Sequence, residues 1–313
     1  MKTNEIEISN AQLRARVSPL GAALVGLWYG DLPRSLVLGY ADGTAAGYMG
    51  ALVGPVANRI GGAAVTIDGT RWQMQANEGA NCLHSGDAGL HSRLWSVDDH
   101  STSHVTLSLT LAHGDCGLPG LRRITVRYAL EGSALRLDIS ATIDRTTVMN
   151  IAHHPYWNLV GSGTIRDHGL QVFGDSYLPV DAGKLPTGAQ ASIRDLGLSP
   201  GEVTQLDQAA PLDHNICLGP GQDTPRPAAC LTGPNGLQLI IETTEPGLQV
   251  YDGAGLPDQP EAATLGAQIG PYAGIALEPQ GWPNAPHHES FPAIMVQSGN
   301  NYRQATRYIL KST

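Results

Sequence analysis

The sequence predicts an all-β protein, built as one large antiparallel β-sandwich domain over residues 1–313. Three observations lead to this prediction. Apolar and polar residues alternate with a period of two in several segments, which is typical of half-buried strands. Turn signals separate these segments, and 38 glycines with 21 prolines allow many more tight turns. Convincing amphipathic helices are scarce, and no repeat of about 20–50 residues indicates a propeller.

The individual elements follow from local patterns. Strands are predicted where alternation is longest, hairpin turns where Asp-Gly, Asn-Gly or Glu-Gly-Ser separates two such runs, and a loop where prolines and glycines gather. In chain order they are a hairpin at Asp68-Gly69, strands at 105–111, 124–128 and 135–143 with a turn at 131–133, a short helix within 189–198, a surface loop at 219–229, a hairpin at Asn235-Gly236, and strands at 248–251 and 274–278.

Strand parity separates the core from a candidate site. In 248–251 the apolar positions are expected to face the core, and Gln249 to face away from it. In 274–278 the same rule puts Glu278 on one face with a glycine and an alanine. We expect these two small residues to leave room for a ligand, and the side chain of Glu278 to project into open space.

Charge excludes some classes of partner. The chain carries 19 Lys plus Arg against 28 Asp plus Glu, a formal net charge of −9 at pH 7. A nucleic-acid-binding protein is expected to show a basic stripe, so no nucleic acid partner is predicted. No membrane partner is predicted either, because the charge disfavours an anionic surface and no apolar run approaches the ~20 residues of a membrane span.

The location is expected to be cytoplasmic. The first residues include acidic side chains and no apolar run of signal-peptide length. The spacings of Cys82, Cys116, Cys217 and Cys230 fit neither a zinc site nor a redox pair, so we expect reduced thiols.

The residue types favour acid/base chemistry over metal or nucleophilic catalysis. His84, His153 and His154 lack the HxH or HxxxH spacing of a zinc site, so no metal site is predicted. The G-x-S-x-G elbow of a serine hydrolase is missing, and no GxGxxG motif follows a strand. His154 and Glu278 each precede a proline, which restricts their backbone to extended geometry. Taken alone, each could be an ordinary solvated or hydrogen-bonded group.

Seven ordered segments change this assessment. They are Val56-Ala-Asn-Arg-Ile60, Asn81-Cys-Leu-His84-Ser-Gly86, His154-Pro-Tyr-Trp-Asn-Leu159, Ser176-Tyr-Leu-Pro-Val-Asp181 with Leu185-Pro-Thr-Gly188, Asp213-His-Asn215, Leu277-Glu278-Pro-Gln280, and Phe291-Pro292. In this order they resemble motifs of the aldose 1-epimerase (galactose mutarotase) family, and the resemblance covers nearly the whole chain.

The resemblance implies a fold, a reaction and roles for residues. The fold would be a large β-supersandwich, in agreement with the strand pattern. The reaction would be that of an isomerase, a mutarotase that interconverts the α and β anomers of a free aldose by acid/base ring opening and reclosure, with no cofactor. Glu278 would be the general base and His154 the general acid. The residues that would hold the monosaccharide are Arg59, His84, Asp213 and Gln249.

Some positions depart from the family pattern. Pro55 stands where many members have Arg, Ser85 replaces a Gly, and Asp252 stands where Thr is usual. These departures bear on the preferred sugar, because the implied acid, base and arginine are all present. Trp157 and Trp282 are candidates for stacking on a sugar ring, with a place in the core as the alternative.

Two alternatives on the same fold are a sugar-phosphate epimerase and a non-catalytic sugar-binding protein. The first needs extra Arg or Lys to pair with phosphate, and the motifs supply Arg59 and little else. The second would be expected to lack Glu278 or His154. A polysaccharide lyase or hydrolase would favour a longer cleft with more than the 5% aromatic residues present. The preferred aldose and the oligomeric state stay open.

Overall fold

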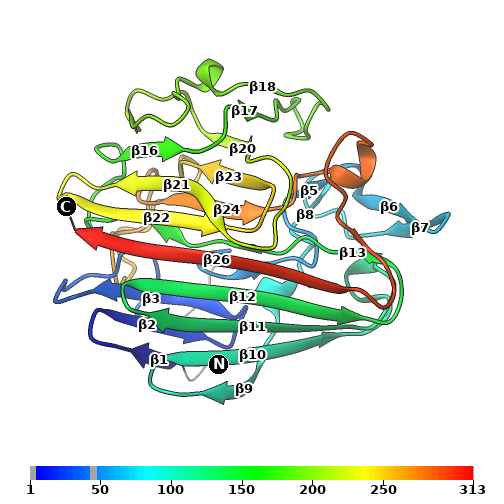
Figure 1. Ribbon diagram of the computed structural model, residues 1–313, viewed down its shortest axis with the longest axis horizontal. Coiled ribbons are helices and arrows are strands. Elements are labelled where there is room, and N and C mark those ends of the chain that lie inside the picture. Colours follow the sequence, from blue (N-terminus) through cyan, green and yellow to red (C-terminus); the bar gives the residue numbers. More distant parts are fainter. Residues whose placement is uncertain (1–4, 43–47, 313) are drawn as a thin grey trace.

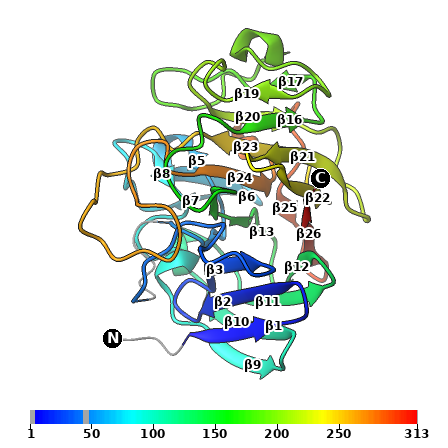
Figure 2. The same cartoon turned by 90° about the vertical axis from the view of Figure 1, so that its left-hand side faces the viewer.

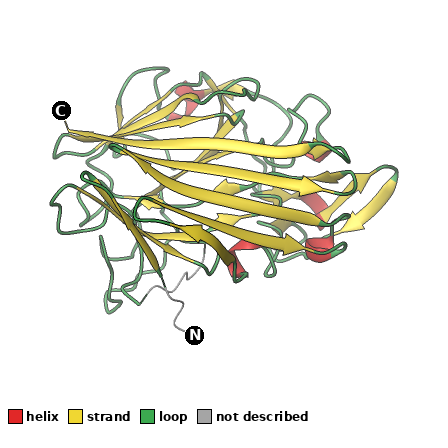
Figure 3. Cartoon of the chain, turned by 60° about the horizontal axis from the view of Figure 1, so that its bottom comes forward, coloured by secondary structure: helices red, strands yellow, loops and turns green. Residues whose placement is uncertain are grey.

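The computed structural model describes residues 5–42 and 48–312, and strands dominate this part of the chain (Figure 3). The helical elements within these residues are single 3₁₀ turns: η1 (Gly61–Ala63), η2 (Leu90–Ser92), η3 (Asp115–Gly117), η4 (Ile193–Leu196) and η5 (Ala285–His287). All strand pairs among the described residues are antiparallel. The prediction of an all-β antiparallel fold is therefore confirmed.

A sheet of nine strands, counted over the described residues, forms one layer of the molecule (Figure 1). Its spatial order is β19 (Thr204–Gln205), β16 (Gly169–Val172), β21 (Arg226–Thr232), β22 (Leu237–Thr243), β26 (Asn301–Ser312), β12 (Ala134–Ile143), β11 (Arg122–Glu131), β10 (His104–Leu111) and β9 (Ser96–His100). The long alternating segments of the sequence are the central strands β10, β11 and β12, because their apolar positions all reach the core. Gly132, at a φ of 60°, turns β11 into β12 as the sequence predicts.

A second sheet has six strands among the described residues, and several of them can be followed in Figure 2. Its order is β15 (Tyr156–Trp157), β24 (Ile275–Gln280), β23 (Gly247–Tyr251), β20 (Asp213–Cys217), β17 (Ser176–Tyr177) and β18 (Ala191–Ser192). Leu248, Val250, Ile275 and Leu277 join the main core cluster, which also contains Leu239 and Tyr308 of the nine-stranded sheet. The two sheets therefore pack face to face as a sandwich.

Smaller sheets complete the fold. They are β1 (Ile6–Ser9), β2 (Leu13–Ser18) and β3 (Ala23–Tyr29), and the ribbons β4 (Leu52–Val53) with β14 (Ala152–His153), β5 (Arg59–Ile60) with β8 (Cys82–Leu83), β6 (Ala64–Ile67) with β7 (Thr70–Gln73), and β13 (Thr147–Val148) with β25 (Met295–Val296). The predicted hairpin at Asp68-Gly69 connects β6 to β7, and both residues have positive φ. The ribbons β4–β14 and β5–β8 matter most here, because they hold His154 and Arg59 beside the six-stranded sheet.

Two local predictions are wrong in part. Residues 189–198 contain β18 and the single 3₁₀ turn η4, because Ser192 Oγ accepts a hydrogen bond from Arg194 N and Gly197, at a φ of 73°, ends the turn at once. The predicted loop 219–229 ends early, since β21 begins at Arg226. Pro227 is tolerated there because the pairing with β22 shifts register between Pro227 and Ala229, so a missing N–H costs little.

The four cysteines are free thiols, as expected. Among residues 5–42 and 48–312, no helix is long and apolar enough to cross a membrane.

Candidate active site

The face of the six-stranded sheet that points away from the core carries the candidate site. Gln249 pairs with Glu278 across β23 and β24, and Asn215 pairs with Gln249 across β20 and β23. Asp213 lies two residues before Asn215, so strand alternation brings it to the same face. The predicted parity of Gln249 and Glu278 is therefore confirmed.

His154 reaches Glu278 from the segment between β14 and β15. Its N–H donates to Ala51 O and its carbonyl accepts from Gly50 N, which holds the backbone in place. His154 Nε2 lies 3.4 Å from Glu278 Oε1. The exposed fractions of the two residues are 4% and 2%. The expectation that Glu278 projects into open space is therefore wrong, because the side chain lies in the buried floor of the site.

Two polar atoms of this pair lack a hydrogen-bond partner among the described residues: Glu278 Oε2 and His154 Nδ1. A buried acceptor without a partner is costly, so such an atom calls for an explanation. Glu278 Oε2 therefore keeps an unused acceptor position in the buried floor of the site.

Burial shifts both groups toward their uncharged forms. It raises the pKa of Glu278 well above its ordinary value, Asp213 raises it further, and Arg59 acts in the opposite direction. Burial lowers the pKa of His154 to about 4, although Asp213 favours the charged imidazolium. A buried acid and a buried base in contact, each with a pKa shifted by burial, are typical of acid/base sites.

The small residues beside Glu278 do not leave room for a ligand, contrary to expectation. A Cβ on Gly274 would lie 2.9 Å from Tyr156 Cβ and 3.0 Å from the side chain of Leu38. Ala276 belongs to the same buried cluster as Tyr156 and Leu38. The small side chains therefore make space for these two large ones.

The two tryptophans are core residues. Trp157 is fully buried in the main core cluster. Trp282 packs edge-on against Phe291, and its Nε1–H donates to Pro246 O over 3.0 Å. Both tryptophans are therefore in the core, and neither is placed to stack on a sugar ring.

Arg59, on β5, is oriented by Glu78. Its Nε and Nη2 atoms donate to the two carboxylate oxygens of Glu78 over 2.6 and 2.8 Å. The side chain of Arg59 is almost completely buried, while that of Glu78 is more than a third exposed. This bidentate contact fixes the plane of the guanidinium group.

His84 follows β8, the partner strand of β5. Its Nδ1 accepts a hydrogen bond from Asn58 N over 3.0 Å, so the proton of the neutral ring is assigned to Nε2. Burial lowers the pKa of His84 well below its ordinary value, and the neighbouring His154 and Arg59 lower it further. A neutral His84 can thus donate one hydrogen bond from Nε2. Its ring centroid lies 5.6 Å from that of His154.

Ser85, which replaces a family glycine, has a structural contact of its own. Its Oγ donates to Val56 O and accepts from Val56 N over 3.1 and 2.9 Å. The hydroxyl thereby ties the segment before Arg59 to the segment that carries His84. Asp252 likewise binds backbone, through Leu212 N and Ala254 N, and supports the start of β20 next to Asp213.

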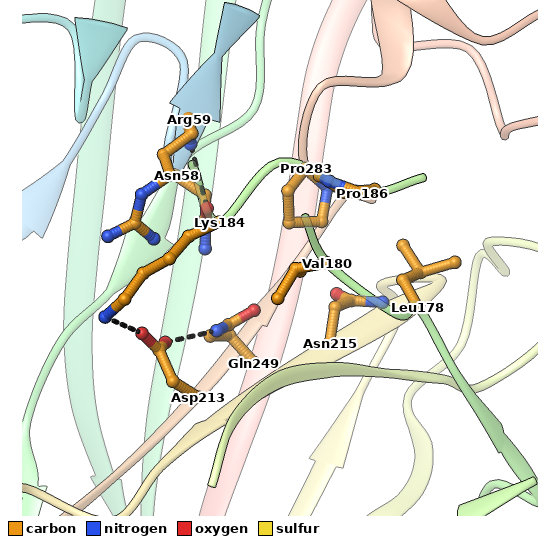
Figure 4. A pocket seen from close by; sticks show the side chains of 10 residues that line it. All are labelled: Asn58, Arg59, Leu178, Val180, Lys184, Pro186, Asp213, Asn215, Gln249 and Pro283. Carbon is orange, nitrogen blue, oxygen red and sulfur yellow. Dashed lines mark hydrogen bonds and ion pairs between the residues drawn. The ribbon is translucent and has the colours of Figure 1, made fainter. Parts of the chain in front are cut away.

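Asp213 lines a small pocket together with Arg59 and Gln249 (Figure 4). Gln249 Nε2 donates to Asp213 Oδ1 over 2.8 Å, and Lys184 Nζ donates to Asp213 Oδ2 over 2.8 Å. Lys184 is a pocket residue that the sequence motifs do not indicate. It lies between the two parts of the 176–188 segment, and only the folded chain brings it onto Asp213.

All six residues proposed from the sequence come together. One pocket is lined by Arg59, Asp213 and Gln249. Gln249 pairs with Glu278 on the neighbouring strand, and Glu278 contacts His154. The ring of His154 lies beside that of His84.

Tyr48 and His91 are two further aromatic residues of this group. The Tyr48 ring packs edge-on against His84 and His91, with centroids 4.5 and 4.8 Å apart. Neither residue falls in one of the seven motif segments.

The sequence-based expectation for metal ligands is that no metal site is present. Among residues 5–42 and 48–312, no group of three or more His, Cys, Asp or Glu side chains could hold a metal ion.

Comparison with known protein families gives one match along the chain. The family model described as "Aldose 1-epimerase" matches residues 4–309. A curated relative named "Galactose mutarotase", from Sus scrofa, is 31% identical over 320 residues, which are 97% of this chain and 93% of the relative. "Aldose 1-epimerase" from Escherichia coli (strain K12) is 32% identical over 281 residues, 84% of this chain and 80% of that protein.

Solved structures agree with this match. The GalM/aldose epimerase homologue from C. elegans superimposes with a TM-score of 0.89 at 30% identity, covering 99% of both chains. Galactose 1-epimerase from Lactobacillus acidophilus gives a TM-score of 0.82 at 24% identity and covers 98% of this chain and 94% of its own, which supports the fold.

Proposed function

The chain belongs to the aldose 1-epimerase family and is a mutarotase, and on that premise we propose that Glu278 and His154 perform the proton transfers on a neutral monosaccharide. The observation that carries this proposal is the contact of His154 Nε2 with Glu278 Oε1 at 3.4 Å, beside a second carboxylate oxygen that has no partner among the described residues. One face of the sheet thus presents an acceptor and a donor to the same small molecule.

The proposed reaction needs one base and one acid. Glu278 takes the proton of the C1 hydroxyl while His154 gives a proton to the ring oxygen. The bond between C1 and the ring oxygen breaks, and an open-chain aldehyde forms. After rotation about C1–C2, the C5 hydroxyl attacks the other face of C1, returns its proton to His154, and the carbonyl oxygen takes the proton held by Glu278. A positioned acid or base contributes about 10²–10⁴-fold each.

The proposed reactive form has Glu278 ionised and His154 protonated. Burial opposes this form, while Arg59 stabilises the carboxylate and Asp213 stabilises the imidazolium. A sugar bound against the two groups adds hydrogen bonds to both. We therefore assign Arg59 and Asp213 a second task besides holding the sugar, the stabilisation of charge on the reacting pair.

Neutral sugars fit the pocket better than sugar phosphates. Arg59 is bound to Glu78, and Lys184 is bound to Asp213. Each of these cations already faces a carboxylate, so its charge is balanced and offers little net attraction to a phosphate group. This supports the free aldose over the sugar-phosphate alternative. The presence of both proton-transfer groups supports an enzyme over a non-catalytic binding protein.

The four free thiols support a reducing location, and we propose that the protein works in the cytoplasm.

Polarimetry tests the proposal. Freshly dissolved α-D-galactose, α-D-glucose and α-D-xylose are followed with and without the protein, together with galactose 6-phosphate. We expect faster mutarotation of at least one neutral sugar and a lower kcat/KM for the phosphate. No acceleration with any sugar, or a preference for the phosphate, would contradict the proposal.

A further inference from the structure

Lys184 is held above the pocket by a short loop with its own hydrogen bonds. A single antiparallel bridge between Val180 and Pro186 closes residues 181–185 into a loop. Asp181 Oδ1 accepts from Gly183 N over 2.8 Å and from Leu185 N over 3.0 Å, and Asp181 O accepts from Lys184 N over 2.9 Å. Lys184 itself has a φ of 58°, a left-handed conformation that residues with side chains rarely adopt. The loop therefore fixes the backbone of Lys184 beside the pocket.

The ion pair of Lys184 with Asp213 is a weak source of stability. The two side chains are 55% and 26% exposed, and exposed ion pairs contribute little to folding. The pair is nevertheless aimed into the pocket, as Figure 4 shows. Its main contribution is therefore expected in ligand binding and not in folding.

The pair offers an acceptor and a donor side by side. Gln249 occupies Asp213 Oδ1 and Lys184 occupies Oδ2, yet a carboxylate oxygen accepts more than one hydrogen bond and an ammonium group has several N–H donors. One hydroxyl can donate to Asp213 while a neighbouring hydroxyl accepts from Lys184. Two hydroxyls on adjacent carbons match this spacing, whereas a lone hydroxyl satisfies only one of the two groups.

The pair also lies at the correct distance from the reacting groups. Asp213 is on β20 and Glu278 on β24, and β23 runs between them. Neighbouring strands are roughly 4.8 Å apart, and Asp213 pairs with Tyr251 while Glu278 pairs with Gln249, two residues further back along β23. The α-carbons of Asp213 and Glu278 therefore lie roughly 12 Å apart, a span that a pyranose ring with a hydrogen bond at each end can fill. A sugar with C1 at Glu278 would present its far side to Asp213 and Lys184.

We infer that Lys184 is a specificity-determining residue, which together with Asp213 selects aldoses that carry two neighbouring hydroxyl groups on the side of the ring remote from C1. The inference rests on the proposed function, because it concerns the same pocket. The expected difference in affinity between sugars with and without these hydroxyl groups is large, because a site built to hydrogen-bond a hydroxyl rejects analogues that lack it.

The test measures binding and turnover separately. D-Galactose and its 2-, 3-, 4- and 6-deoxy derivatives are titrated calorimetrically into the wild-type protein, Lys184→Met, Lys184→Arg and Lys311→Met. Lys311 lies at the exposed end of β26 and serves as the matched control for loss of one cation. Mutarotation of the same sugars is followed by polarimetry.

In the wild type we expect about tenfold or greater loss of affinity at two adjacent ring positions. Lys184→Met should weaken galactose binding by about tenfold and abolish the loss at one of these positions while the other stays, because Asp213 remains. The value of kcat for galactose should change by less than about twofold. Lys184→Arg should restore part of the effect, and Lys311→Met should behave as wild type.

Three results would overturn the inference. The first is tighter binding by Lys184→Met, which would make Lys184 a competitor of the sugar. The second is the same pattern of losses in Lys184→Met as in the wild type, and the third is the absence of two adjacent sensitive positions in the wild type. A wild-type protein that binds galactose without mutarotation would refute the proposed function alone, since the binding pattern still decides the role of Lys184. A wild type that does not bind galactose at millimolar concentration would refute both.

Discussion

The burial of Glu278 and His154 is the residue-level feature that governs their chemistry. Each is less than a tenth exposed, and burial shifts each pKa toward the uncharged form. A purely structural acid in this position would be expected to have its oxygens hydrogen-bonded, yet Glu278 Oε2 has no partner among the described residues. This unused acceptor is consistent with the proposed role of the pair in proton transfer.

Substitution of either group should reduce turnover far more than binding. Glu278→Gln and His154→Asn each keep the approximate shape of the side chain and remove its proton transfer. We expect kcat to fall by about 10²–10⁴-fold in each variant, while KM changes less because the proposed sugar contacts of Arg59, His84 and Asp213 remain. Mutarotation kinetics measure both quantities.

The exposed Glu261 provides the matched control, since Glu261→Gln removes a carboxylate outside the site. A thermal melt of each variant separates lost chemistry from lost folding. More than about a tenth of wild-type kcat in Glu278→Gln or His154→Asn would show that the residue is not an essential proton-transfer group.

Glu245, in the turn before β23, predicts a pH dependence of stability. Burial raises its pKa from 4.5 to about 8, with Thr244 and Arg226 acting in the opposite direction. The folded state thus keeps a proton that the unfolded state releases. This contribution to stability is fully present below about pH 4.5 and is lost as the pH rises toward 8.

Glu245→Gln should remove most of this dependence. Between pH 5 and pH 8 the wild type should lose on the order of 3 kcal/mol of unfolding free energy relative to the variant, because one pKa unit is worth about 1.4 kcal/mol. Urea denaturation at the two pH values gives the difference. Parallel stability curves for the wild type and Glu245→Gln would contradict the assignment.

At the level of elements, the long strands are predictable and the short ones are not. The alternation in β10, β11 and β12 spans many residues and follows from one buried face. The two-residue strands β14 and β15 on either side of His154 are too short to show a period. Their pairing is set by tertiary contacts, so sequence patterns could indicate His154 as a candidate but could not show what it touches.

The two hydrogen bonds between Ser85 and Val56 connect the segment after the short strand β8 to the segment before the short strand β5. Their contribution to the free energy of unfolding can be measured. Ser85→Ala removes both hydrogen bonds to Val56 and leaves the buried Val56 N–H without its partner. We expect a loss of about 1–3 kcal/mol in unfolding free energy. Ser85 also has a φ of 66°, so Ser85→Gly should lose less than Ser85→Ala, because glycine tolerates this conformation.

Chemical denaturation of both variants tests this order. The same stability for Ser85→Ala and wild type would show that the hydroxyl contributes nothing. If Ser85→Gly were less stable than Ser85→Ala, the left-handed backbone at residue 85 would not be a source of strain.

At the level of the whole molecule, the sandwich and the polar face of its smaller sheet follow from strand parity. Parity assigns Gln249 and Glu278 to one side, but it cannot say what covers that side. Tyr156 and Leu38 occupy the space beside Gly274, and the loop 181–185 brings Lys184 over Asp213. Both are contacts between segments far apart in the chain, which no local pattern encodes.

The activity of the whole protein is expected to be independent of metal ions. The proposed acid and base are side chains, so prolonged incubation with EDTA should leave the mutarotation rate unchanged. The rate is compared with that of an untreated sample and of a sample supplemented with zinc. A loss of activity that zinc restores would contradict an acid/base mechanism without metal.

The alternation of core and site residues along β23 and β24 limits how this protein could be redesigned. Neighbouring positions on each strand serve opposite faces, so a deletion or insertion of one residue would exchange them along the rest of the strand. Libraries that change strand length would therefore mostly yield unfolded chains. Variation directed at residues 182–184, inside a loop with closed ends, would alter the sugar contacts while the sheet register stays intact.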